Sequence, residues 1–173
     1  MKVKIRIGID PGKDGFISAN VDGDLIFDPM PTIGKEYDLD TFDSILRAYK
    51  EVGGDIHCCV ENVHAIQGGG ATSNFQFGKG VGIIEALLAS NKIPTTKVSP
   101  IKWQKLAWEG VTIQVKPNPK NKSGKSTDTK ATSLIAAKRL YPDVDLRKSN
   151  RARVPHDGKV DSLLILHYCL MKI

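Results

Sequence analysis

The chain has 173 residues, of which 40% are hydrophobic, and its formal net charge is +6. This length is enough for one domain with its own core, and we expect a single domain over residues 1–173. No stretch reaches the ~20 consecutive apolar residues of a membrane span, and Met1–Lys4 lacks a signal-peptide core. Cys58, Cys59 and Cys169 lie in apolar runs without metal-ligand spacing, so we expect reduced thiols in a cytoplasmic protein with no membrane partner.

The N-terminal part predicts strands and then one helix. Runs rich in β-branched residues predict strands over 3–9, 15–21 and 24–27, and Asp22-Gly23 is typical of a hairpin turn between the last two. Apolar residues at helical spacing then predict a helix.

That helix runs from Leu39 to Tyr49, with Asp40 or Thr41 as its N-cap and Gly53-Gly54 at its end. The segment DIHCCVEN follows and predicts a short buried strand that closes on Glu61. Strand, helix and strand in this order favour a layered α/β structure.

The rest of the chain continues the alternation of helices and strands. In chain order we predict a Gly-rich loop (64–74), a helix (75–90), a strand (92–99), a helix starting at Pro100 (100–108), an exposed loop (110–126), a helix (128–140), a basic loop (146–156) and a last helix (158–173). This order predicts a mixed α/β layer fold without internal repeats.

Four carboxylates stand at the ends of predicted elements. Asp10 and Glu61 each end an apolar strand, and if those strands are neighbours both acids emerge at one edge of the sheet. Asp157 and Asp161 are four residues apart and share one helix face. The alternative for each acid is a structural role, because Asp157 and Asp161 also suit a helix N-terminus by charge.

Clustered carboxylates repel one another, and the cluster persists only if cations neutralise it. Oxygen ligands suit Mg²⁺ or Mn²⁺. Two such ions ~3.5–4 Å apart can activate a water and stabilise the leaving oxygen in phosphodiester hydrolysis. We therefore expect two ions in one active site.

Positive charge is concentrated in one stretch. The segment from residue 97 to residue 130 contains eight lysines but only two acidic residues, Glu109 and Asp128. Such a stretch suggests a polyanion partner, although a solvated lysine surface has the same composition.

Five segments together resemble the RuvC family of Holliday-junction resolvases, in particular its phage-type members. They are IGIDPG, VENVHA, SNFQFGKGVGIIEALL, VSPIKWQK and HDGKVDSLLIL, and they occur in order between residues 5 and 168. The resemblance implies an RNase H-like fold with a mixed central sheet flanked by helices. It also implies a homodimer in a bacterial or phage-infected cell that nicks two strands of a four-way junction symmetrically with Mg²⁺ or Mn²⁺, and no nucleotide cofactor.

The same resemblance assigns the metal site to Asp10, Glu61, Asp157 and Asp161. Some family members hold the last two ligands three residues apart, and here that position is Gly158. The spacing of four makes Asp157 the expected ligand, with the adjacent His156 as the alternative.

Several residues are expected to face DNA, on the resemblance in one case and on residue type and charge in the others. His64 takes the place of an aromatic residue that enters the junction centre in relatives, and Gln67 lies in a loop whose backbone can approach phosphates. Phe75 and Phe77 either stack on bases or serve as core or dimer contacts, and Gly78, Gly80 and Gly82 suggest a helix surface for the dimer. The expected phosphate contacts are Lys79, Lys102, Lys105, Lys116, Lys120, Lys122, Lys125, Arg151, Arg153 and Lys159, with Trp103 beside Lys102 and Lys105.

Other interpretations explain less of the sequence. IGIDPG also resembles the first phosphate loop of actin-like ATPases, which need a second such loop. The segment PNPKNKSGKST ends like a Walker A loop but has Pro119 in place of its first glycine. A non-catalytic DNA-binding module accounts for the lysines but not for the acids, so an RNase H-like nuclease acting on other branched or flapped DNA is the main alternative.

Overall fold

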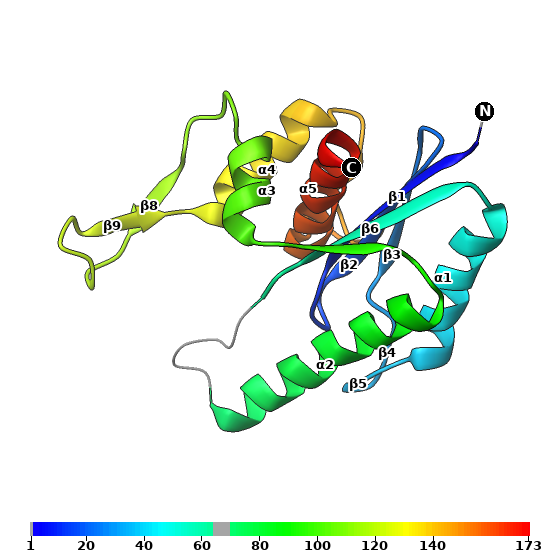
Figure 1. The fold of residues 1–173 in the computed structure, drawn as a ribbon. Helices are drawn as coiled ribbons and strands as arrows, with labels where there is room; N and C mark the ends of the chain where they lie inside the picture. The colour runs from blue at the N-terminus through cyan, green and yellow to red at the C-terminus, as the bar shows by residue number, and fades with distance from the viewer. Residues whose placement is uncertain (1, 64–69) are drawn as a thin grey trace.

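The computed structural model describes residues 2–63 and 70–173 (Figure 1). Its centre is a five-stranded sheet in the order β3-β2-β1-β6-β7. The strands are β1 (Lys4–Asp10), β2 (Phe16–Val21), β3 (Asp24–Pro29), β6 (Asp55–Glu61) and β7 (Thr95–Val98). The first three form an antiparallel meander, while β6 runs parallel to β1 and β7 runs parallel to β6. The predicted mixed sheet is confirmed.

Helices cover both faces of this sheet, as Figure 1 shows. One face carries α1 (Leu39–Val52) and α2 (Ala71–Ser90), and the other carries α3 (Pro100–Ala107), α4 (Thr129–Leu140) and α5 (Asp157–Lys172). Side chains of a strand alternate between the faces. Ile5, Ile7 and Ile9 therefore join the core beneath α1 and α2, and the residues between them face α5.

A glycine in the central strand allows α5 to lie close to the sheet. A Cβ atom at Gly8 would lie 2.3 Å from the backbone nitrogen of Leu166 and 2.5 Å from the carbonyl oxygen of Ser162. Beside this contact, the buried hydroxyls of Ser18 and Ser162 form a hydrogen bond of 2.6 Å. The close approach brings the first turns of α5 to the end of β1.

Some predicted boundaries are wrong for local reasons. The N-cap of α1 is Asp38, not Asp40 or Thr41, because its carboxylate accepts the Thr41 backbone N–H at 3.1 Å. Helix α2 begins at Ala71 and therefore takes up the last residues of the predicted Gly-rich loop. Gly53 ends α1 as predicted, with a positive φ of 74°.

Two short hairpins were not predicted. The first joins β4 (Thr32–Ile33) to β5 (Glu36–Tyr37), and the second joins β8 (Val115–Pro117) to β9 (Lys125–Thr127). The second lies in the segment predicted to be a loop. In Figure 1 it projects away from the layers of the fold.

No helix within the described residues has the length and apolar character needed to cross a bilayer. The three cysteines, Cys58, Cys59 and Cys169, are buried and unbridged, in agreement with the thiols expected from the sequence.

Candidate active site

Two acids meet where β1 and β6 end. These strands are parallel neighbours in which Ile9 pairs with Val60, so the next residues, Asp10 and Glu61, leave the sheet at the same edge. Asp10 lies two residues after Gly8, on the face that packs against α5. Glu61 lies two residues after Cys59, which belongs to the core on that same face. The sheet therefore places both carboxylates on one edge and one face, as predicted.

Helix α5 supplies the other two acids in its first two turns. Asp157 is its first residue and Asp161 follows one turn later. Gly158 lies between them, and a Cβ there would meet the Asp14 carbonyl oxygen at 2.3 Å and Asp10 Oδ2 at 3.1 Å. This position, which carries a ligand in some relatives of the resembled family, thus has no room for a side chain here.

The neighbouring acids are close enough to raise the pKa of Asp10 and of Asp161. The pKa of Asp10 is well above its usual value, first because of burial and then because of Asp161, Glu61 and Asp157. Burial, Glu61 and Asp157 raise the pKa of Asp161 to about 7. Burial also raises the pKa of Glu61, against the opposing effect of a hydrogen bond from Trp103. Like charges packed in a poorly solvated site are the physical cause.

Two of the acids are oriented by hydrogen bonds from the surrounding helices. The indole N–H of Trp103 on α3 donates to Glu61 Oε1 at 2.9 Å. The Ser133 hydroxyl on α4 hydrogen-bonds to Asp161 and lowers its pKa in part. That serine in turn accepts the Trp108 indole N–H at 3.2 Å. The helices behind the sheet thus fix the direction of the carboxylates.

The position of Trp103 corrects one prediction. We expected its side chain at the DNA surface, but it is only 1% exposed and lies in the core beneath α3 and α5. Its apolar ring is buried because α3 must close this side of the sheet, and its one polar atom is used by Glu61. Trp103 is therefore a positioning residue rather than a DNA contact.

Lys130 is part of the site although the sequence analysis did not select it. Its ammonium group forms an ion pair of 2.5 Å with Asp157, and this contact raises the pKa of Lys130. Lys130 lines a cavity of about 600 Å³ together with Asp10, Asp157 and Asp161. The only sequence signal is a lysine in the first turn of a helix, which is too common to distinguish this residue.

His156 also lines the cavity, at the N-cap of α5. Its ring lies 5.1 Å from the ring of Phe16, and its buried Nδ1 has no hydrogen-bond partner among the described residues. Burial lowers the pKa of His156, which favours the neutral imidazole that metals bind. Both His156 and Asp157 therefore line the cavity, and both remain candidates for the fourth metal ligand.

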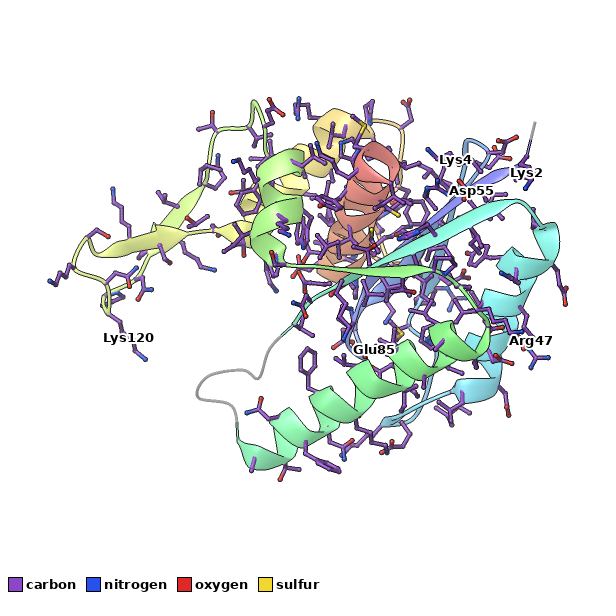
Figure 2. The ribbon with its side chains drawn as sticks, viewed as in Figure 1. Lys2, Lys4, Arg47, Asp55, Glu85 and Lys120 are labelled. Carbon is purple, nitrogen blue, oxygen red and sulfur yellow. The ribbon has the colours of Figure 1, made fainter. Side chains whose placement is uncertain are left out.

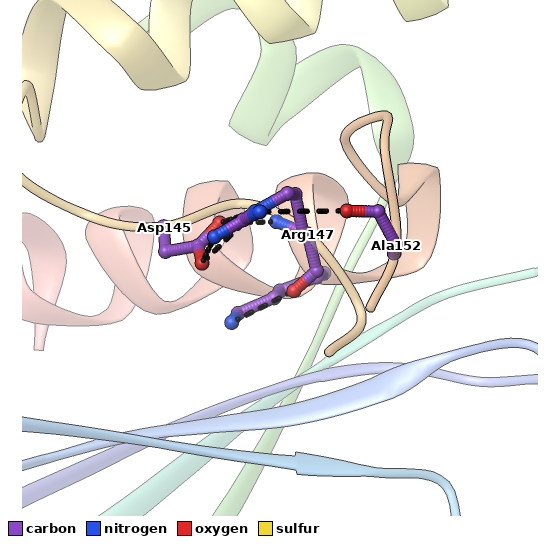
Figure 3. Close-up of polar contacts among 4 residues, drawn as sticks. Asp145, Arg147 and Ala152 are labelled. Carbon is purple, nitrogen blue, oxygen red and sulfur yellow. Dashed lines mark hydrogen bonds and ion pairs between the residues drawn. The ribbon is translucent and has the colours of Figure 1, made fainter. Parts of the chain in front are cut away.

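Hydrogen bonds fix the shape of the segment before α5, between Asp145 and His156. The guanidinium of Arg147 binds both carboxylate oxygens of Asp145, at 2.9 Å and 2.7 Å, and donates to the Ala152 carbonyl at 3.5 Å (Figure 3). The His156 backbone N–H donates to the Leu146 carbonyl at 2.8 Å. These contacts fix where α5 begins and hence where its acids lie.

The donor set fits a hard divalent cation, because partly buried carboxylate oxygens need positive charge nearby. Among the residues the structure describes, no three His, Cys, Asp or Glu side chains already form a coordination shell. Asp157 is bound to Lys130 instead. The ion pair takes up one oxygen, Oδ2, of the Asp157 carboxylate, and so Lys130 competes with a metal for this expected ligand.

The expected DNA contacts divide into three groups. His64 and Gln67 lie outside the described residues. Lys79 is paired with Glu36 at 2.7 Å, and Lys159 donates to the Arg147 carbonyl and lies 4.6 Å over the Phe27 ring. The remaining members are all exposed, and Lys116 among them lies 3.9 Å from an Asp128 carboxylate oxygen; they are Lys102, Lys105, Lys116, Lys120, Lys122, Lys125, Arg151 and Arg153.

Four of the exposed lysines lie on the hairpin of β8 and β9, here called the basic arm (residues 115–127). They are Lys116, Lys120, Lys122 and Lys125, and the arm contains no acidic residue. In Figure 2 Lys120 lies at the end of the arm, apart from the sheet and the helices that cover it. At the base, the Asp128 backbone N–H donates to the Gln114 carbonyl at 2.8 Å. Asp128 caps α4, the helix that carries Lys130, so the arm is attached beside the site.

Comparisons with solved structures identify the fold of this chain. RuvC of Thermus thermophilus in complex with a Holliday junction substrate matches 97% of this chain and 94% of its own, at 12% identity and a TM-score of 0.59. A second Thermus thermophilus RuvC structure matches 96% of each chain, at 15% identity and a TM-score of 0.50. Yeast mitochondrial Holliday junction resolvase Ydc2 matches 93% of this chain and 75% of its own, at 15% identity and a TM-score of 0.48. No family model and no curated protein sequence matches. The fold is RNase H-like, of the RuvC type.

Proposed function

We propose that this protein is a metal-dependent endonuclease that resolves four-way DNA junctions by paired, symmetric hydrolysis of phosphodiester bonds. The observation that carries the proposal is the meeting of four carboxylates at one edge of the sheet. Asp10, Asp157 and Asp161 line one cavity, and Glu61 is close enough to raise the pKa of both Asp10 and Asp161. The RuvC-type fold, in which a solved relative holds a Holliday junction, supports this substrate class. The segments that resemble phage-type members of that family support the same subtype here.

In this proposal the four carboxylates would hold two Mg²⁺ or Mn²⁺ ions, and these ions would supply Lewis-acid activation of water and stabilisation of the leaving oxygen. Trp103 and Ser133 keep Glu61 and Asp161 directed into the site through their hydrogen bonds. Lys130 occupies Asp157 in the absence of metal. Once released, its ammonium group is close enough to the cavity to bind a phosphate oxygen.

The proposed DNA surface consists of the exposed lysines on α3, the arginines before α5 and the basic arm. Each true phosphate contact releases counterions and adds about one unit to the salt dependence of binding. No nucleotide cofactor is part of the proposal.

The first experiment is Asp10→Asn. We expect it to abolish cleavage while junction affinity stays within about twofold, because it removes a metal ligand and no phosphate contact. Cleavage and gel-shift assays on the same four-way junction give both quantities, with the shift run in Ca²⁺ or EDTA. Normal cleavage at ordinary Mg²⁺ concentrations would contradict the mechanism.

The main alternative is an RNase H-like nuclease for flaps or other branched DNA. Product geometry separates the two functions when four-way, flap and hybrid substrates are compared. Paired nicks at symmetric positions of the four-way junction support resolution, whereas single cuts on flaps or hybrids support the alternative.

A further inference from the structure

A second cavity, of about 250 Å³, adjoins the candidate active site. Gly12 and Lys13, in the loop after β1, line both cavities. The remaining walls of the smaller one come from β5 and the first turns of α2, and consist of Tyr37, Ser73, Gln76 and Phe77. Among the described residues, the wall that the two cavities share is therefore the loop that follows Asp10.

The fold holds Tyr37 firmly at this position. A Cβ atom at Gly80 of α2 would lie 2.6 Å from the Tyr37 hydroxyl oxygen, so the ring packs directly on the helix backbone. The Gly12 backbone N–H hydrogen-bonds to the same hydroxyl. The hairpin of β4 and β5 lies beside α2 (Figure 1), and an ion pair between Glu36 and Lys79 links the two. Tyr37 is therefore fixed between the active-site loop and the helix.

The walls of this cavity suit a flat heterocycle that carries polar groups on its edge. Tyr37 and Phe77 offer aromatic surfaces for stacking. Ser73 and Gln76 supply donors and acceptors, and the Lys13 ammonium adds a positive charge for a phosphate. The volume lies below the ~300–1,000 Å³ of pockets for drug-sized ligands, so a single ring system is the appropriate size.

We infer that this cavity takes the base of a nucleotide next to the phosphate that is cut, unstacked from its neighbours at the branch point. The inference rests on the proposed function, since it requires DNA in the adjoining cavity. Bases at a branch point are easier to unstack than bases within a duplex. Stacking of one base on an aromatic side chain contributes ~1–3 kcal/mol. A base bound in this cavity would also make the rate of cleavage depend on the identity of that base.

The test combines changes in the DNA with changes in the protein and measures binding affinity, so it does not depend on cleavage. An abasic nucleotide is moved one position at a time around the branch point of a four-way junction, and affinity is measured in Ca²⁺. For the unmodified protein we expect one position at which loss of the base weakens binding by about 5- to 150-fold, the equivalent of the stacking energy. In Phe77→Leu and in Tyr37→Leu the same abasic junction should bind no more weakly than the intact one.

Two control variants define the effect. Tyr37→Phe keeps the ring and should keep the abasic penalty, while Thr72→Ala lies on the exposed side of the same helix turn, outside the cavity lining. A second measurement sequences the products from junctions randomised beside the cut, where Gln76→Ala should reduce base preference to below about twofold.

The outcomes separate this inference from the proposed function. If the protein cuts junctions symmetrically but shows no abasic penalty at any position, or if Phe77→Leu and Tyr37→Leu keep the penalty, the base pocket is wrong and the resolvase proposal stands. If the penalty appears and disappears as expected but nothing is cut, the pocket stands and the catalytic proposal fails. A protein that binds no junction refutes both.

Discussion

The acids of the site oppose folding in the absence of metal. Asp10, Glu61 and Asp161 all have a raised pKa, with burial as the first cause. A carboxyl whose pKa is higher in the folded than in the unfolded state contributes stability that is complete below its unfolded pKa and is lost as pH rises through its folded pKa. For Asp161 this loss occurs between about pH 4 and pH 7.

We therefore expect Asp161→Asn to stabilise the metal-free protein at pH 8. The gain should be on the order of 2 to 4 kcal/mol above pH 7 and should shrink toward zero near pH 4. Urea unfolding in EDTA across this pH range measures it, and Asp143→Asn, at an exposed position outside the cavity, is the control. Equal stability of Asp161→Asn and the parent at pH 8 would show that folding does not raise the pKa of Asp161.

Lys130 forms an ion pair with Asp157, and we expect it to compete with metal for this carboxylate. Its replacement in Lys130→Met removes both the ion pair and a positive charge from the cavity. We expect Mn²⁺ to bind this variant more tightly in the absence of DNA, by about 3- to 10-fold, equivalent to ~0.7–1.4 kcal/mol. Isothermal titration calorimetry measures the affinity, and Lys138→Met on the same helix is the control. Unchanged or weaker Mn²⁺ binding would contradict the competition.

At the scale of elements, the basic arm differs from the rest of the molecule. An isolated two-stranded hairpin is marginal in water, and this one is supported at its tip by hydrogen bonds from Asn118 to Gly124 and from Asn121 to Lys125. A two-stranded ribbon has the width of a DNA major groove. The arm therefore suits a duplex arm of the proposed substrate.

Removing two charges from the arm tests this role. Lys120→Ala with Lys122→Ala should weaken junction binding and lower the slope of log affinity against log salt by about two units. The matched control is Lys2→Ala with Lys4→Ala, which removes the same charge on the opposite side of the view in Figure 2. Fluorescence anisotropy over a salt series measures both. Equal slopes for the two double variants would exclude the arm from the DNA surface.

At the scale of the whole molecule, two symmetric nicks require two active sites, and hence the homodimer that we propose. The glycines of α2 do not share one face as the sequence suggested. Gly80 is buried against Tyr37, whereas a Cβ atom at Gly78 or Gly82 would meet nothing within 4 Å. Gly78 and Gly82 are four residues apart and form the exposed strip on which a second copy can approach.

Gly82→Leu should therefore weaken a dimer formed through α2 by more than about tenfold, because the side chain fills the space that the partner helix would use. The monomer should still fold, as the position is open. Sedimentation equilibrium with and without junction DNA measures the association, with Ala48→Leu on the exposed face of α1 as the control. A parent protein that is monomeric under both conditions would refute the dimer itself.

The sequence alone determined the strands, the long helices and the acids, because these depend on local patterns. The alternation through Ile5, Ile7 and Ile9 fixes which face of β1 is apolar, and therefore that Asp10 lies on the other. The helical spacing of Asp157 and Asp161 likewise places both on one turn of α5. Short elements such as β4 and β5 escaped prediction because two residues carry no period.

Only the tertiary structure decided which residues surround the acids. Trp103 looked like a DNA contact, yet the packing of α3 buries it and directs its N–H to Glu61. Lys130 and Tyr37 lie far in sequence from Asp10 and reach its surroundings through the docking of α4 and of the β4–β5 hairpin. These contacts depend on how separate layers approach one another, and no local pattern of residues encodes that distance.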